Sequence, residues 1–284
     1  MKQPTLEQLT QAVKEMPAFP ESVNKIVELA SDINCSAKQL VRVIEHDPVV
    51  TVKILKMVNS SFYSLPRKLT SAHHAVAYLG LNTVKNLAVG IAAVGILSTK
   101  SLGSFNTNAF LHHSLCTAVI ARRLGLKTKD KHHLDPTEFF VAGLLHDFGK
   151  LVFMRNYSDA FVQAIDQSRE RHCSLHEVEL EILGIDHAQV GGILGKEWGL
   201  PDHLTVCMRS HHEASHEGGM LLDSIIVANI LSKVRGIGNS GNSFVPEDLP
   251  EQAIHSFGDR TLEMVDRWVG DISEEYEDAR AMAT

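Results

Sequence analysis

The sequence predicts an all-α protein. Along its 284 residues, helix start signals recur and are followed by apolar residues at intervals of three and four, the period of a helix with one buried face. No stretch of five or more residues alternates convincingly between apolar and polar side chains, as a half-buried strand would. Hydrophobic residues make up 44% of the chain and charged residues 21%, which excludes disorder for most of it. We therefore expect helices packed around a hydrophobic core.

The first half of the chain carries two strong helix signals. Ser36 and Gln39 form a capping-box pattern, in which each side chain can bond the backbone N–H of the other residue. Asp47 precedes Pro48, which places a capping side chain before a proline suited to the first helical position. In order, the expected elements are a helix behind Ser36, a helix from Pro48 through Val58, a loop at 60–68, a short helix at 71–78 ending near Gly80, an apolar helix from 82 or 83 to about 97, and a polar turn at 98–106.

The second half continues in the same way. Asp135 precedes Pro136, Ser174 and Glu177 form another capping-box pattern, and Asp186 is a further N-cap. In order, we expect a helix at 112–124 stopped by Gly125, a charged loop at 127–134, an apolar helix behind Asp135 that contains His146 and Asp147, a helix from Ser174 to Gly184, one from Asp186 to about Gly199, one from Pro201, an apolar helix at 220–234, a loop at 236–246, a weaker helix at 261–268, and an acidic tail with a solvated charged face.

A polar turn separates two apolar parts of the chain near residues 98–110. We therefore divide the chain into an N-terminal helical subdomain at 1–104 and a second helical subdomain, with a C-terminal helical extension, at 105–284. The longest apolar run, 87–97, has eleven residues, whereas a membrane span needs about 20. We interpret this run as a core helix and expect no membrane association.

Charge and cysteine content limit the partners and the compartment. The chain has 27 Lys and Arg against 34 Asp and Glu, a net charge of −7, and an acidic surface does not attract a phosphate backbone. Nucleic acid is therefore not an expected partner. The four cysteines, at 35, 116, 173 and 207, form no close pair of the kind that binds zinc or exchanges disulfides. We expect four buried, reduced thiols in a cytoplasmic protein.

The sharpest chemical signal is the segment LLHDFGK, which contains His146, Asp147 and Lys150. A histidine and an aspartate next to each other in an apolar helix must find partners, because an unpaired buried charge is costly. Two interpretations are open: a hydrogen-bonded His–Asp pair in the core, or two ligands of one metal ion. Lys150 either contacts a phosphate group or is exposed at the helix end.

Further histidines stand out among the sixteen in the chain, since histidine is the commonest metal ligand. His113 lies near the start of one expected helix, His187 opens another, and His211 and His212 end a third. Each one taken alone is typical of an ordinary surface or core histidine. Together with His146 and Asp147, they resemble the way helical bundles build metal sites from facing side chains.

The chain is also similar to a known family. The segments MPAFPESVNKIVELASD, IEHDPVVTVKILKMVNSSFY and LTSAHHAVAYLGLNTVKNLAVG resemble the HDOD family, the HD-related output domain of bacterial signalling proteins, and LLHDFGKL resembles the His-Asp signature of HD metal-dependent phosphohydrolases. The resemblance runs from about residue 16 to about residue 234. It implies a helical N-terminal bundle packed on an HD-like helical domain.

The resemblance also implies a ligand set for one or two divalent first-row ions such as Fe, Mn or Zn. His113 matches the early histidine of HD enzymes, with His112 as the competing choice. His146 and Asp147 match the doublet. The dinuclear branch, which includes the HD-GYP phosphodiesterases, adds three histidines, matched here by His187, His211 and His212.

One ligand position departs from that pattern. HD enzymes carry a late aspartate where this chain has Asn229, and Asp223, six residues earlier on another face, is a poor substitute. The Gly-Tyr-Pro motif is also missing after His212. An amide oxygen brings no charge, so Asn229 should hold metal less tightly, favour a bound anion and leave an attacking water poorly oriented. We expect anion binding with little or no turnover.

Two functions from different classes remain open at this point. The first is a regulatory module of bacterial signal transduction, whose partners are other signalling proteins and whose metal-binding pocket has weak or no hydrolysis. The second is an active phosphohydrolase acting on a nucleotide or cyclic nucleotide, with Lys150 in contact with phosphate. A purely structural helical domain is the third interpretation.

Overall fold

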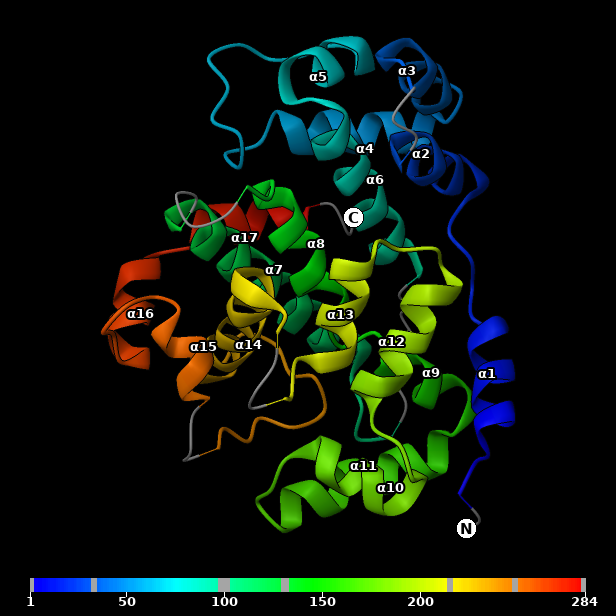
Figure 1. Cartoon of the computed structure of the whole chain (residues 1–284), viewed down its shortest axis with the longest axis vertical. Helices are drawn as coiled ribbons and strands as arrows, with labels where there is room; N and C mark the ends of the chain where they lie inside the picture. The colour runs from blue at the N-terminus through cyan, green and yellow to red at the C-terminus, as the bar shows by residue number, and fades with distance from the viewer. Residues whose placement is uncertain are drawn as a thin grey trace.

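The computed structural model describes residues 3–31, 35–96, 103–128, 133–213, 217–246 and 250–281. Within these ranges the regular secondary structure consists of helices, and no strand is longer than one residue (Figure 1). This confirms the all-α prediction. The first part contains α1 (Leu6–Lys14), α2 (Glu21–Ser31), α3 (Ala37–Glu45), α4 (Pro48–Val58), α5 (Ala72–Leu79) and α6 (Leu81–Ile96). The second part contains α7 (Thr107–Lys127), α8 (Pro136–Leu145), α9 (Gly149–Asn156), α10 (Ser158–Glu170), α11 (Leu175–Leu183), α12 (His187–Glu197), α13 (Asp202–Ser210), α14 (Gly219–Val234), α15 (Glu251–His255), α16 (Leu262–Val269) and α17 (Ser273–Arg280).

The capping signals place most of the expected helix starts correctly. The Ser36 box is formed in both directions, and the Asp47 side chain accepts hydrogen bonds from the N–H groups of Val49 and Val50. Asp135 and Asp186 cap α8 and α12 in the same way. The box expected at Ser174 is wrong in its chemistry. Ser174 does precede α11, but its side chain makes no capping hydrogen bond.

α6 connects the N-terminal end of the molecule, formed by α2 to α5, to the rest (Figure 1). It is buried along most of its length because it packs against α2, α4, α5 and α8. None of the helices in the described ranges combines the length and apolar composition that a membrane crossing requires. α1 lies apart from the other N-terminal helices, alongside α9 and α12 (Figure 1). The polar turn expected at 98–106 falls largely outside the described residues, and the division at residue 104 stays a prediction.

The helix expected at 112–124 is longer than predicted, because Gly125 does not end it. α7 runs from Thr107 through Gly125 to Lys127. A Cβ atom on Gly125 would lie 2.7 Å from the ring of Phe139 on α8. This glycine therefore allows close packing of α7 against α8 and is not a stop signal.

The acidic tail is also more ordered than a solvated charged face. It forms α17, which packs against α7. Arg123 of α7 donates to both carboxylate oxygens of Glu275, at 2.6–2.9 Å. Asp278 accepts a 2.7 Å hydrogen bond from the backbone of Ser61, and Tyr276 is hydrogen-bonded to His112. One side of the tail thus joins α7 to the loop after α4.

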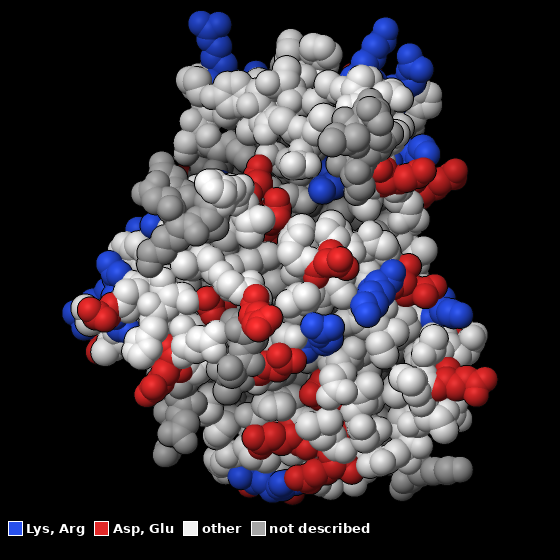
Figure 2. Space-filling model, viewed as in Figure 1, with Lys and Arg blue, Asp and Glu red and all other residues white. Residues whose placement is uncertain are grey.

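The cysteines are all free thiols, but only two of them are buried. Cys116 and Cys207 are buried, whereas Cys35 and Cys173 are half-buried. The expectation of four buried thiols is therefore wrong for the latter two, which lie just before α3 and before α11. In Figure 2, Lys and Arg side chains project from the end formed by α2 to α5, and Asp and Glu are mixed with further Lys and Arg over the larger, lower part of the molecule.

Candidate metal centre

The His146–Asp147 doublet lies in a tight turn between two helices. The sequence-based prediction, which placed it inside one helix, is wrong. α8 ends at Leu145 and α9 begins at Gly149. Hydrogen bonds from Phe148 N–H to the Leu145 carbonyl and from Lys150 N–H to the Asp147 carbonyl span three residues, so the chain tightens here. The break directs both side chains of the doublet into the interior.

Gly149 brings this turn close to α12. A Cβ atom at residue 149 would lie 1.9 Å from the carbonyl oxygen of His187 and 2.7 Å from the N–H nitrogen of Gly191. Both neighbours are backbone atoms, which a side-chain rotation cannot move away. On its other side α12 packs against α13, where a Cβ on Gly192 would meet the side chain of Arg209 at 2.8 Å. These glycines let the turn at the doublet, the start of α12 and the end of α13 approach closely, which brings His146, His187 and His211 together.

We expect Gly149→Ala to lower the free energy of unfolding by about 3 kcal/mol, because the new methyl group overpacks a backbone contact. Gly95→Ala is the matched control: Gly95 is exposed near the end of α6, and a Cβ there meets nothing within 4 Å. That substitution should be neutral or stabilise the protein by up to about 1 kcal/mol. Urea unfolding of both variants checks the prediction, and equal effects would contradict it.

Asp147 is the centre of the cluster. One of its oxygens, Oδ1, lies 3.1 Å from Nε2 of His187 and 3.4 Å from Nε2 of His211. The other, Oδ2, lies 3.4 Å from Nε2 of His146 and 3.6 Å from Nε2 of His113. Each carboxylate oxygen therefore faces two imidazole nitrogens, and all five side chains are buried.

His212 extends one side of this cluster. Its Nε2 lies 2.9 Å from Nε2 of His187, and its ring lies beside that of His211, with centroids 4.2 Å apart. The candidate ligand atoms fall into two groups that share Asp147, and within each group they lie within 4.8 Å of one another. The first group is His113, His146 and Asp147; the second is Asp147, His187, His211 and His212.

Backbone carbonyls set the orientation of two of the rings. Nδ1 of His146 lies 2.7 Å from the carbonyl oxygen of Gly143, and Nδ1 of His211 lies 3.0 Å from that of Met208. A carbonyl oxygen can only accept, so in each ring Nδ1 carries the proton. In the neutral ring, Nε2 then presents a bare lone pair to Asp147.

His113 and His187 are oriented in the same way by side chains. Ser232 donates its only hydroxyl proton to the carbonyl oxygen of Asn229, so its oxygen accepts from Nδ1 of His113 at 3.0 Å. Glu179 accepts from Nδ1 of His187 at 2.5 Å and from its backbone N–H at 2.8 Å. A histidine held by a carboxylate at its far nitrogen is typical of metal sites.

Sequence reasoning missed Glu179, although a signal was present. The buried residues of α11 are Leu175, Val178, Glu179 and Leu183, so a glutamate occupies a position on the buried face of the helix. A buried carboxylate needs a partner, and His187, which lies eight residues further along the chain, provides it.

We expect Glu179→Gln to lower metal affinity by about 10- to 100-fold, because His187 loses the carboxylate that orients its ring. Glu181→Gln is the control, since Glu181 is exposed and pairs with Arg171 on the surface. Metal titration in competition with a chelator measures both. If the two variants bind metal equally well, Glu179 has no orienting role.

The electrostatics of the cluster favour ligands in their metal-binding protonation states. Burial lowers the pKa of His211 to about 4, and it holds the pKa of His113 and of His212 well below the ordinary value. Burial by itself would raise the pKa of Asp147, but His146, Lys150 and hydrogen bonds outweigh it and hold the pKa well below its usual range. His187 differs, because Glu179 and Asp147 outweigh burial and raise its pKa. The three neutral rings and the ionised carboxylate are in the protonation states that a divalent metal requires.

In the cluster, hydrogen-bond acceptors of the histidine rings face hydrogen-bond acceptors of the Asp147 carboxylate. Nε2 of His113, His146 and His211 and Oδ1 of Asp147 are buried and have no hydrogen-bond partner among the described residues. Bare nitrogen lone pairs directed at carboxylate oxygens repel unless a cation lies between them. The donor set, imidazole with one carboxylate, suits divalent first-row metals. These residues therefore fit one or two such ions.

The structure places the alternative ligand residues that the sequence left open in different surroundings. His113 faces Asp147, whereas its neighbour His112 is hydrogen-bonded to Tyr276 of α17. Asp223 accepts a hydrogen bond from Ser256 and does not line the cavity described below. Asn229 does line it, and its Oδ1 is buried without a hydrogen-bond partner in the described ranges.

Lys150 is not exposed at a helix end, which was one of the two expectations. It is only 4% exposed and donates to Oδ2 of Asp147 at 2.6 Å and to the Ser240 hydroxyl at 3.1 Å. Its ammonium group thus lies directly beside the carboxylate that both groups share. A phosphate contact by Lys150 stays a prediction.

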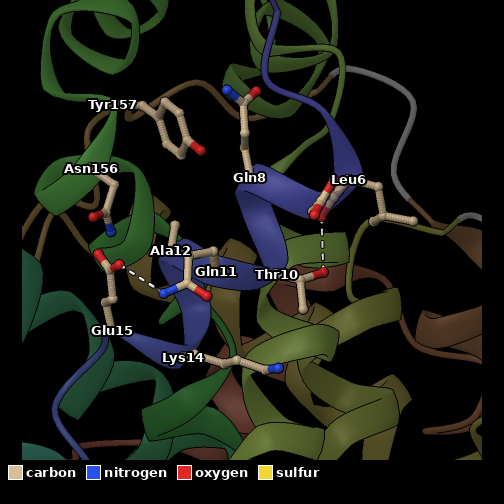
Figure 3. Close-up of a pocket in the computed structure, with 10 residues that line it drawn as sticks. Leu6, Gln8, Thr10, Gln11, Ala12, Lys14, Glu15, Asn156 and Tyr157 are labelled. Atoms are coloured by element: carbon tan, nitrogen blue, oxygen red, sulfur yellow. Dashed lines mark hydrogen bonds between the residues drawn. The ribbon is translucent and has the colours of Figure 1, made fainter.

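The three histidines of the second group line a cavity of about 450 Å³, which Lys150, Asn229 and Lys233 also line. A larger groove of about 1000 Å³ lies elsewhere, along α1 next to Asn156 and Tyr157 (Figure 3). The hydrogen bonds drawn in it, Gln11 to Glu15 and Thr10 to Leu6, join residues of α1 and its C-cap Glu15. That groove has no histidine in its lining, so the cavity beside Asp147 is the candidate site.

Comparison with known proteins identifies the family of the chain. The model of the HDOD domain family matches residues 16–214. An uncharacterised protein from Treponema pallidum is 23% identical over 221 residues, which is 77% of this chain and 42% of that protein. The chain thus spans about two-fifths of the length of this curated relative.

Solved structures share the fold over nearly the whole chain. A candidate phosphohydrolase from Shewanella amazonensis has a TM-score of 0.73 at 20% identity, covering 97% of this chain and 98% of that one. An HDOD domain protein of unknown function from Geobacter sulfurreducens has a TM-score of 0.72 at 24% identity, covering 98% of each chain. A candidate signal transduction protein from Marinobacter aquaeolei has a TM-score of 0.70 at 24% identity, covering 100% of this chain and 61% of that one. At these identities the likeness establishes the fold.

Proposed function

This chain belongs to the HDOD family, and on that premise we propose that it is a bacterial signalling module with a metal-binding pocket and weak or no hydrolysis. The observation that carries the proposal is the arrangement at Asp147, where four histidine nitrogens face two carboxylate oxygens. Such a buried cluster is costly without a cation. It therefore serves as a metal site in this proposal.

The two groups of side chains would hold one ion each. His113 and His146 would bind the first ion, and His187, His211 and His212 the second, with Asp147 between the two. Fe, Mn or Zn suits imidazole-rich sites. When bound, such ions polarise a phosphoryl group and lower the pKa of a bound water.

Asn229 is the reason for proposing weak hydrolysis. It lies at the cavity wall with His187 and His211, where HD enzymes would carry a carboxylate. Its amide offers an oxygen but no charge, and it cannot accept a proton from an attacking water. The residues that remain hold a metal and an anion better than they activate a nucleophile.

Elemental analysis together with a screen of phosphomonoesters and phosphodiesters tests this function. We expect one or two first-row ions per chain and turnover well below the ordinary enzyme range of about 1–1000 per second. Protein without bound metal would overturn the proposal. Turnover within the ordinary range would instead establish the second candidate, an active phosphohydrolase acting on a nucleotide or cyclic nucleotide, which the placement of Lys150 beside Asp147 favours.

We expect Asn229→Asp to raise metal occupancy, because a charged ligand binds a hard cation more tightly than a neutral one. Hydrolysis of a generic phosphodiester should rise with it. Asn82→Asp is the matched control. Asn82 is exposed on α6, so this substitution adds the same charge away from the site. Metal content per chain, measured after identical purification, should rise only in the first variant. Equal occupancy in all three proteins would show that residue 229 does not contact metal.

Partners and location belong to the same proposal. We propose that other signalling proteins bind this module and that it works in the cytoplasm. Free thiols at all four cysteines support a reducing compartment.

A further inference from the structure

The cavity beside the metal centre differs in charge between its inner end and its mouth. Buried lining residues mark the inner end and exposed ones mark the mouth. His187, His211, Lys150 and Asn229 are buried. Glu177, Glu213 and Glu251, which line the same cavity, are exposed.

The half-buried Lys233 adds a second ammonium group to the cavity besides that of Lys150. Lys233 lies on α14, four residues after Asn229 and therefore on the same face of that helix. It lines the cavity and donates to the carbonyl oxygen of Phe244 at 3.3 Å. Lys233 is not among the residues that the family resemblance assigns to the metal site.

Charges around the inner end are matched in number before any metal binds. The ammonium groups of Lys150 and Lys233 match two carboxylates behind the lining, that of Asp147, which accepts from Lys150, and that of Glu179, which accepts from His187. Every positive charge that a bound ion brings is then uncompensated, because Asn229 is neutral. Its buried Oδ1, which has no hydrogen-bond partner in the described ranges, faces the same space as the lysines.

We propose that this cavity selects ligands with a single phosphate group, which Lys150 and Lys233 hold at the inner end, and that the glutamates at the mouth reject a second phosphate. The inference rests on the proposed function, because the metal supplies the uncompensated charge. A phosphate monoester carries close to two negative charges at neutral pH, which matches the one divalent ion that the second group of ligands would hold beside the cavity. The ligand class is a phosphomonoester the size of a nucleoside monophosphate, a size that suits a pocket of about 450 Å³.

The walls and mouth define the rest of the ligand. Leu175, Ile226 and Ile230 are buried and apolar, and they suit the flat or apolar body of such an ester. Beyond them the three carboxylates accept hydrogen bonds from amine or hydroxyl groups. A diphosphate or a cyclic dinucleotide would instead bring its second anionic group toward these carboxylates, where like charges repel.

The test compares inorganic phosphate, AMP, ADP and a cyclic dinucleotide by isothermal titration calorimetry on the full chain, with metal content measured on the same samples. We expect phosphate and AMP to bind, with ADP and the cyclic dinucleotide about tenfold weaker than AMP. Lys233→Met should weaken phosphate and AMP by about tenfold without lowering metal content. Lys196→Met, an exposed lysine of α12 outside the cavity, is the control and should change neither.

The second part of the test removes the negative charges of the three glutamates at the mouth of the cavity. A variant with glutamine at residues 177, 213 and 251 should bind ADP nearly as tightly as AMP, whereas glutamine at the exposed residues 197, 263 and 274, outside the cavity, should keep the preference. Metal-free protein that still prefers AMP would contradict the proposed function alone. Metal-loaded protein that binds ADP as tightly as AMP, or binds none of the four probes, would overturn the present inference alone.

Discussion

Replacing Asp147 with asparagine should reduce metal affinity by at least about 100-fold, more than the loss of an orienting residue does. Asp147 is the one carboxylate that both groups of candidate ligands share. Its two oxygens face the Nε2 atoms of four histidines, and an amide cannot bridge two cations as a carboxylate does. The Asp147→Asn variant should therefore lose both ions, and elemental analysis of the dialysed variant would show this.

The same substitution should destabilise the metal-free protein by about 3–5 kcal/mol, because Lys150 loses the charge that pairs with its buried ammonium group. Removing both charges in Asp147→Asn with Lys150→Met should restore most of that stability but no metal. Asp223→Asn is the control for metal content, since Asp223 is buried but bonded to Ser256 away from the cluster. An Asp147→Asn protein that keeps its metal would refute the shared-carboxylate geometry.

Lowering the pH from about 7 to about 4 should strongly destabilise the metal-free protein. Burial lowers the pKa of His211 from 6.5 to about 4 and holds the pKa of His113 and of His212 well below 6.5. As the pH falls below 6.5, these rings take up protons in the unfolded chain but not in the folded one, so unfolding is favoured. For His211 alone the shift corresponds to about 3 kcal/mol.

The pKa of His187 is shifted in the opposite direction, so His187 has the opposite effect on the pH dependence of stability. Burial would lower its pKa, but Glu179 and Asp147 together raise it, so its contribution is present below pH 6.5 and is lost as the pH rises through the folded value. One group of this kind does not offset three of the other, and stability should fall toward acid overall. Urea unfolding in the presence of a chelator at pH 7.5, 6 and 4.5 measures the effect.

His211→Gln should weaken this pH dependence, whereas His46→Gln should leave it unchanged, because His46 is exposed at the end of α3. Unfolding midpoints that stay constant or rise between pH 6.5 and 4.5 would be incompatible with neutral buried rings. The metal-loaded protein should lose its metal over the same range, since protons compete for the ring nitrogens.

Local signals in the sequence predicted the helical fold and most of its helix starts. Ser36, Asp47, Asp135 and Asp186 cap the helices that follow them because a capping bond joins residues only two or three apart. Where the decisive contact was distant in sequence, the local signal misled. Gly125 marks a close approach to Phe139, and the acidic tail is held by Arg123 and Ser61.

The residues of the candidate site were identifiable from sequence, but their arrangement was not. His113, His146, Asp147, His187, His211 and His212 were recognisable by residue type and family resemblance, and their role as ligands stays a prediction. The turn at the doublet, the carbonyls behind His146 and His211, and the carboxylate of Glu179 come from the tertiary structure.

Residue type determined what each side chain of the site can donate or accept, and the family resemblance in the sequence predicted a histidine-rich centre with one carboxylate and an amide at residue 229. Only the tertiary structure decided which nitrogen of each ring faces inward and that Asp147 joins two groups of histidines. It also placed Lys233 in the same cavity as Lys150. The reason is that hydrogen bonds and charges act over a few ångströms in space, between groups up to about 120 residues apart along the chain, such as His113 and Ser232.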